Sequence, residues 1–189
     1  MKKNTHIDSA KKIIQSEIKS LQRLVKKIDG TFSRACELVL NSSGKIVTIG
    51  LGKSGHIAKK MSATLSSTGT PSIFIHASEA LHGDMGAINK NDIIIFYSNS
   101  GETKEILQLL PLVKIIKSKI ISITGNLKST LAKKSTVALD ASVTREACPL
   151  NLAPSSSSMC ALAISDAIAL TVSSNKGFTS KDFAKTHPE

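Results

Sequence analysis

The chain has 189 residues, of which 41% are hydrophobic and 21% charged, and its formal net charge at neutral pH is +11. This length and composition are typical of one globular domain, or of one domain with a helical extension. Aromatic residues make up only 3% and Trp is absent, so the lysines predict a solvated surface and no nucleic-acid partner. No apolar stretch of membrane-spanning length is free of charge or serine, so no membrane partner is expected either.

The N-terminus and the cysteines indicate a cytoplasmic protein. Residues 1–6 are partly basic but precede no apolar core, so they are not expected to be a signal peptide. Cys36, Cys148 and Cys160 are odd in number and widely spaced, which predicts reduced and mostly buried thiols.

The first 40 residues predict two helices. Asp8 or Ser9 can cap a helix that runs to about Lys27, and Asp29-Gly30 ends it. Its apolar residues form one stripe: Ile13, Ile14, Ile18, Leu21, Leu24, Val25 and Ile28. A second helix is expected over about 31–40. We therefore expect residues 1–40 to form a helical extension that packs on a domain made of residues 41–189.

Strands and helices alternate through the rest of the chain. Strands are predicted at 45–50, 72–76, 92–98, 119–124 and 136–140, and helices at 54–67, 102–117, 128–134 and about 156–174. This order predicts an α/β fold, a doubly wound five-stranded parallel sheet with helices on both faces. In such sheets, ligands bind outside the carboxyl ends of the strands.

A glycine-rich loop follows the first predicted strand, with the sequence Gly50-Leu-Gly-Lys-Ser-Gly55. It fits the dinucleotide fingerprint G-x-G-x-x-G, with Glu79 available as a ribose-binding acid. It does not fit a P-loop, because Val47 stands where that motif needs its first glycine. A monophosphate site at a helix N-terminus and a plain glycine turn also fit the pattern.

A second loop favours the monophosphate. The third predicted strand runs into Ser98-Asn-Ser-Gly-Glu-Thr103, and another helix follows. The hydroxyls of Ser98, Ser100 and Thr103 can converge on one phosphate group, which a dinucleotide site does not require. The two loops together predict a pocket for a small phosphorylated molecule.

Six separated motifs resemble the sugar isomerase (SIS) domain of the arabinose-5-phosphate isomerase family, whose fold is flavodoxin-like. They are Gly50–His56, Ser66–Pro71, Glu79–Asp84, Ser98–Glu102, Glu146–Leu150 and Leu152–Ser155. The resemblance continues through Gly177-Phe-Thr and ends at His187-Pro188. It covers the chain from about Ala35 onward.

The resemblance implies interconversion of D-ribulose 5-phosphate and D-arabinose 5-phosphate, without a cofactor or a required metal. In that family, the product feeds synthesis of 3-deoxy-D-manno-octulosonate (KDO) for lipopolysaccharide, and a homotetramer is implied. The alternatives are a non-catalytic sugar-phosphate-binding SIS module and a truncated remnant. Members of the family commonly continue beyond His-Pro with a pair of nucleotide-sensing (CBS) repeats. This chain stops at Glu189, so we expect a short form without them.

The resemblance also implies the site residues. The catalytic group falls on Lys53, Glu105, Glu146 and His187. Residues expected to bind substrate, from the two loops and from the resemblance together, are Ser54, Gly69, Thr70, His76, His82, Ser98, Ser100, Thr103, Ser142, Val143 and Thr144. His76 is further implied to hold an inhibitory zinc ion, although two histidines six residues apart are weak evidence of a metal site.

Aldose–ketose isomerisation requires such groups, because a proton must leave a carbon next to a carbonyl and return to its neighbour through an enediolate. Glu146 lies among apolar residues, so we expect a raised pKa and the role of base. Glu105 either shares this role or only complements a helix dipole. Lys53 can stabilise the developing oxyanion. From the resemblance, His187 opens the sugar ring and reaches a neighbouring subunit's site.

Overall fold

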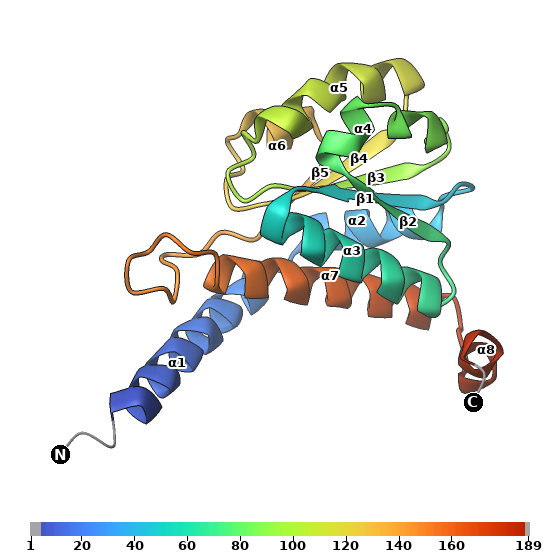
Figure 1. Cartoon of the computed structure of the whole chain (residues 1–189). Coiled ribbons are helices and arrows are strands. Elements are labelled where there is room, and N and C mark those ends of the chain that lie inside the picture. Colours follow the sequence, from blue (N-terminus) through green and yellow to red (C-terminus); the bar gives the residue numbers. More distant parts are fainter. Residues whose placement is uncertain (1–4, 188–189) are drawn as a thin grey trace.

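The computed structural model describes residues 5–187 and contains a five-stranded sheet between two layers of helices (Figure 1). The strands are β1 (Ile46–Gly50), β2 (Ser72–His76), β3 (Ile93–Tyr97), β4 (Lys119–Thr124) and β5 (Val137–Asp140). They lie in the order β2-β1-β3-β4-β5, and every pair is parallel. The predicted fold class is confirmed, and each predicted strand is within one residue of its observed bounds.

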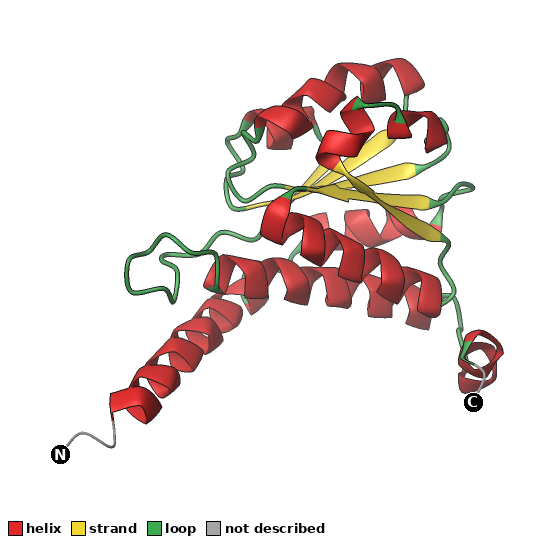
Figure 2. Cartoon of the chain, in the orientation of Figure 1, coloured by secondary structure: helices red, strands yellow, loops and turns green. Residues whose placement is uncertain are grey.

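The helices divide between the two faces of the sheet (Figure 2). One face is covered by α2 (Gly30–Leu40), α3 (Gly52–Ser67) and α7 (Ser156–Asn175), with the end of α1 (Thr5–Val25) beside α7. The other face carries α4 (Ala77–Leu81), the 3₁₀ turn η1 (Asp84–Ala87), α5 (Lys104–Ile116) and α6 (Thr130–Lys134). Each face has its own cluster of buried apolar side chains. Because both faces are covered, strands such as β3 are buried at every position, as their continuous apolar sequences predict.

Parallel pairing brings the ends of the strands into line. Gly50 is paired with His76 on one side and with Tyr97 on the other, and Thr124 is paired with Asp140. We call the end of the sheet that holds these residues the carboxyl edge, and the opposite end the amino edge. The loops that follow β1, β3 and β5 therefore all leave the carboxyl edge.

Helix α1 differs from the prediction at its start and on its apolar side. It begins at Thr5, so Asp8 and Ser9 lie within the helix and neither caps it. Of the predicted apolar stripe, only Leu24 is buried and Leu21 packs partly against the core. The side chains of Ile14, Ile18 and Val25 are respectively 55%, 47% and 72% exposed. An apolar stripe in the sequence predicts that the surface is buried, but it does not show whether the same chain or a second molecule buries it.

Helix α7 is the one candidate for a membrane span within residues 5–187. By length and composition it is apolar enough to cross a membrane, but serines and Asp166 interrupt it, as expected of the longest apolar stretches in the sequence. It packs against α1, α2 and α3, and half of its apolar stretch is buried inside the fold, which fits a core helix. Three short helical segments were not predicted, namely α4, η1 and α8 (Ser180–Thr186).

Candidate active site

The first glycine loop makes a tight connection between β1 and α3. A Cβ atom at Gly50 would lie 2.9 Å from Gly55 Cα, so strand and helix approach more closely than another residue would allow. Gly52 has φ +55°, a left-handed conformation that glycine adopts without strain. The loop places Lys53 on the surface in the first turn of α3, with Ser54 half-buried behind it.

The second loop is braced from within. Ser98 is only 3% exposed, its Oγ lies 2.7 Å from Thr103 Oγ1, and it accepts the Gly101 N–H at 3.0 Å. Ser100 is exposed, and its Oγ accepts the Glu102 N–H. The predicted convergence of three hydroxyls therefore needs refinement. Ser98 and Thr103 hold the loop together, and Ser100 presents its hydroxyl at the surface.

Two of the longer helices begin at the carboxyl edge without a side-chain cap. The N-cap residues of α3 and α5 are Leu51 and Thr103, and neither side chain accepts a bond from its helix. By contrast, Asp29 caps α2 and Ser129 caps α6. Within residues 5–187, the first N–H groups of α3 and α5 therefore have no side-chain cap beside the two loops, and such groups bind anions.

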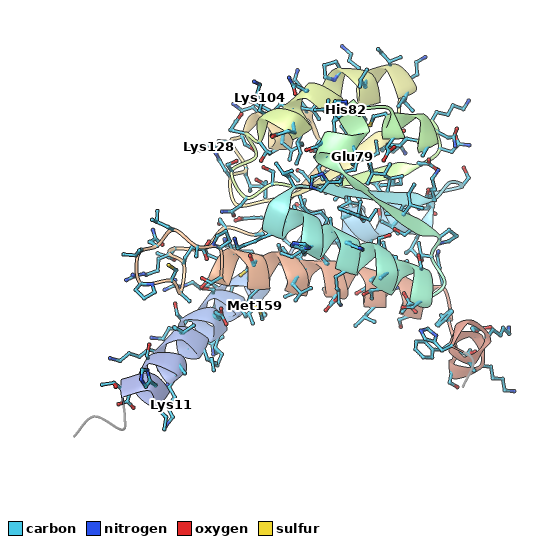
Figure 3. All side chains as sticks on the ribbon, in the orientation of Figure 1. Lys11, Glu79, His82, Lys104, Lys128 and Met159 are labelled. Atoms are coloured by element: carbon cyan, nitrogen blue, oxygen red, sulfur yellow. The ribbon has the colours of Figure 1, made fainter. Side chains whose placement is uncertain are left out.

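Lysines add positive charge at the same edge. Lys104 opens α5, Lys128 precedes α6, and Figure 3 shows both at the end of the sheet where those helices begin. Both are exposed, as is Lys53. An anionic ligand would be attracted to this edge by the lysines and held by the helix N-termini.

Glu146 is buried in the loop between β5 and α7, but its surroundings are polar. Its Oε2 accepts the N–H groups of Ser155 and Ser157 at 2.9 and 3.1 Å and the Ser155 hydroxyl at 3.2 Å. Its Oε1 accepts the Ser157 hydroxyl. Glu146 thereby supplies the cap that α7 lacks from its own N-cap residue. It is a helix cap contributed from nine residues upstream.

These bonds reverse the expected pKa of Glu146. Burial favours the neutral acid, but the hydrogen bonds from Ser157 and Ser155 outweigh burial and hold the pKa below its ordinary value. The expectation of a raised pKa was wrong. Ser155 and Ser157, nine and eleven residues later in the sequence, donate hydrogen bonds to the Glu146 carboxylate in place of the water that burial removes. Glu146 is therefore ionised at neutral pH.

The other predicted residues of the carboxyl edge lie in or directly after four elements, α5, β2, α4 and β5. Glu105 is half-buried in the first turn of α5, and within residues 5–187 its carboxylate accepts no side-chain hydrogen bond. His76 ends β2 and is half-buried, whereas His82 follows α4 and is exposed (Figure 3). The segment 142–144 follows β5.

For metals, the described residues contain no group of three or more His, Cys, Asp or Glu side chains placed to share an ion. Zinc at His76 therefore stays a prediction.

The remaining predicted residues lie at the amino edge of the same chain. Gly69 and Thr70 precede β2, and Thr70 Oγ1 accepts a bond from Lys176 Nζ at 2.9 Å. A Cβ atom at Gly69 would lie 2.6 Å from the Phe178 ring, so the segment after α7 packs directly on this turn. Helix α8 lies beyond that segment (Figure 1). His187 follows α8 and is exposed and stacked on Phe183. Within a single chain, Gly69, Thr70 and His187 therefore lie away from the loops of the carboxyl edge.

The residues that position this edge were missed at the level of the sequence. The run Ser155–Ser158 was interpreted only as a helix start, although its serines hold Glu146. Glu102 was quoted only as part of a motif, yet its Oε1 accepts the Thr130 N–H at 2.7 Å and ties the second loop to α6. A glutamate followed by a serine pair nine residues later is the one local signal that could have indicated the cap.

Comparison with known proteins agrees with this geometry. The family described as SIS domain matches residues 39–171, which is most of the chain. The chain belongs to the SIS domain family.

Among curated relatives of this SIS chain is arabinose 5-phosphate isomerase KdsD of Pseudomonas aeruginosa, 52% identical over 182 residues. The match covers 96% of the chain and 56% of the relative. The Francisella tularensis protein of the same name is 48% identical over 97% of the chain and 57% of the relative. The SIS chain thus spans little more than half the length of these relatives.

A solved structure resembles the SIS chain over its whole length. It is an E. coli CFT073 protein in complex with arabinose 5-phosphate, with 41% identity and a TM-score of 0.96, and each chain covers 100% of the other.

Proposed function

We propose that this SIS chain is an aldose–ketose isomerase that interconverts D-ribulose 5-phosphate and D-arabinose 5-phosphate through an enediolate. The observation that carries the proposal is the set of groups at the carboxyl edge. Two helices begin there without side-chain caps, beside an exposed lysine and within the same layer of loops as two carboxylates. The names of the curated relatives and the arabinose 5-phosphate complex of the similar structure support the choice of substrate.

The proposed roles follow from position. The N–H groups at the starts of α3 and α5, with the hydroxyls of Ser100 and Thr103, hold the phosphate. Lys53 stabilises the enediolate oxygen. Glu146 is ionised, as a base must be, and takes the proton from carbon, with Glu105 as the second candidate. We keep His187 as the acid–base for ring opening.

We further propose that the protein is a homotetramer in which a second copy completes each site. The exposed apolar side of α1 supports a contact between copies, because contiguous apolar surface of this kind usually marks an interface. The position of Gly69, Thr70 and His187 at the amino edge supports a site shared between chains. Sedimentation analysis tests the assembly: Ile14→Lys with Ile18→Lys should dissociate it, whereas Lys11→Glu on the same helix should not.

The activity is tested directly by NMR. The purified chain is incubated with D-ribulose 5-phosphate in D₂O, and the expected product is D-arabinose 5-phosphate carrying deuterium at C2. D-Ribose 5-phosphate is the control product, because it has the opposite configuration at C2. The alternative, a non-catalytic sugar-phosphate-binding module, would show ligand-induced thermal stabilisation without any deuterium incorporation.

The cellular setting belongs to the same proposal. A cytoplasmic location is supported by three free cysteines, two buried and one half-buried. The product would supply KDO for lipopolysaccharide, as the resemblance implies, and no cofactor is proposed.

A further inference from the structure

Lys27, two residues beyond the end of α1, contacts the segment that follows β5. Its Nζ lies 3.0 Å from Asp140 Oδ2 and donates to the Ser142 carbonyl oxygen at 2.9 Å. It also donates to Ser142 Oγ. The Lys27 ammonium group therefore contacts three oxygen atoms of one turn, more than 110 residues away in the sequence.

The turn itself is closed by the same carboxylate. Ser142 N–H donates to Asp140 Oδ1 at 2.7 Å, so Asp140 binds Lys27 with one oxygen and the Ser142 backbone with the other. The side chains of Lys27 and Asp140 are 29% and 28% exposed, so the pair is mostly removed from water. We call Lys27, Asp140 and Ser142 the clasp.

Asp140 is ionised within the clasp. Burial opposes its charge, but bonds from Ser142 and Lys27 outweigh burial and hold its pKa below the ordinary value. Lys27 thus neutralises a carboxylate at the carboxyl edge, where a phosphorylated ligand would otherwise meet a negative charge.

Few other side chains hold residues 142–144. Within residues 5–187, the side-chain hydrogen bonds that reach Ser142 and Thr144 come from Lys27, Asp140 and Arg23. Arg23 lies on the last turn of α1, and its Nη1 donates to Thr144 Oγ1 at 2.6 Å. The polar anchoring of residues 142–144 therefore depends on the end of the N-terminal helix.

We propose that Lys27 is a positioning residue, which holds residues 142–144 in place for substrate through Asp140 and Ser142 and ties α1 to the site. The inference rests on the proposed function, and on the expectation from the family resemblance that residues 142–144 contact the sugar phosphate. Lys27 itself need not touch the substrate.

The test replaces the ammonium and keeps the length of the side chain. Lys27→Met should raise KM for D-ribulose 5-phosphate about tenfold, with kcat within about twofold of wild type, because ground-state positioning is lost. Lys27→Arg should recover most of the affinity. Lys26→Met is the matched control, because Lys26 is exposed and its side chain makes no hydrogen bond or ion pair within the described chain.

A partner variant separates charge from structure. Lys27→Met leaves the Asp140 carboxylate without its cation. Adding Asp140→Asn removes that negative charge and should bring KM back toward the wild-type value. A role confined to stability would lower the melting temperature of Lys27→Met and leave KM unchanged, which would overturn the proposal. So would an equal effect of Lys26→Met.

Hydrogen–deuterium exchange gives a readout that does not depend on activity. Peptides covering residues 141–145 should exchange several-fold faster in Lys27→Met than in wild type or in Lys26→Met. Unchanged exchange there contradicts the clasp. If the wild-type chain turns over no ribulose 5-phosphate, the proposed function fails, and the exchange experiment still decides whether Lys27 positions the segment.

Discussion

The two edges of the sheet differ in how far one chain can complete them. At the carboxyl edge, the segments after β1, β3 and β5 supply glycines, hydroxyls, Lys53, Glu105 and Glu146. Hydrogen bonds from Ser155 and Ser157 hold Glu146, and Glu102 ties the second loop to α6. At the amino edge, Gly69 and Thr70 pack against the segment after α7, and His187 lies beyond it. The difference teaches that one chain gathers the proposed anion-binding and proton-transfer groups at one edge and leaves His187, the proposed ring-opening residue, at the other.

The largest effect is expected from the carboxyl edge. Glu146→Gln should slow the exchange of the substrate's carbon-bound proton with solvent deuterium about 10²–10⁴-fold, the usual contribution of a general base. Phosphate-dependent binding should persist, which thermal shift with inorganic phosphate measures. Exchange at nearly the wild-type rate would leave Glu146 only its role as the cap of α7 and would move the base to Glu105, which Glu105→Gln then tests.

A truncation addresses the amino edge. A variant that ends at Lys185 should use the cyclic aldose about a hundredfold more slowly than wild type, with little change in affinity because the phosphate loops are intact. Mixed with inactive Glu146→Gln chains, it should regain part of its activity in hybrid oligomers. Inactivity in verified hybrids would place the histidine within its own subunit's site, and the comparison between the edges would fail.

Two serines of one loop sharpen the comparison further. Ser100→Ala should raise KM roughly 10- to 100-fold, because a hydrogen bond to a charged phosphate is worth about 1.5–3 kcal/mol. Ser98→Ala should instead lower the free energy of unfolding by about 1–3 kcal/mol, since its buried hydroxyl holds Gly101 and Thr103. Urea unfolding and steady-state kinetics on both variants distinguish the roles. Equal KM values for Ser100→Ala and wild type would put the phosphate elsewhere.

The smallest effect concerns pH. Because the folded-state pKa of Glu146 is lowered, its ionised form stabilises the fold above its unfolded pKa, near the ordinary value of 4.5. This contribution should disappear as the pH falls from that value through the folded pKa. Glu146→Gln should therefore show a weaker acid dependence of unfolding than wild type below about pH 4.5. Parallel curves for the two proteins would contradict the hydrogen-bonded cap.

The sheet and the loops that leave it were predictable from the sequence because their signals are local. Five apolar runs marked the strands, and glycines marked the turn after β1, where Gly50 and Gly55 meet. The short helix α4 gave no such signal, because it has five residues and no side-chain cap, whereas α6, equally short, begins at a capping serine, Ser129.

What could not be predicted depends on contacts between distant segments. The pKa of Glu146 is lowered by hydrogen bonds from Ser155 and Ser157, which the fold places beside it. The prediction considered only its apolar neighbours in the sequence. Lys27 and Asp140 are more than 110 residues apart and carry no shared pattern. The exposed side of α1 was predicted as an apolar stripe, but a sequence does not state whether its own chain covers it.

The division of the core into two clusters has a consequence for how the chain forms during synthesis. The cluster beneath α4, α5 and α6 draws on residues from Val47 to Leu131, so it can assemble once that stretch has left the ribosome. The opposite cluster needs Cys160, Ile164 and Val172 of α7, which emerges after all five strands. Until α7 has emerged, a nascent chain therefore leaves part of one apolar face of its sheet uncovered, and this is the face that chaperones would shield.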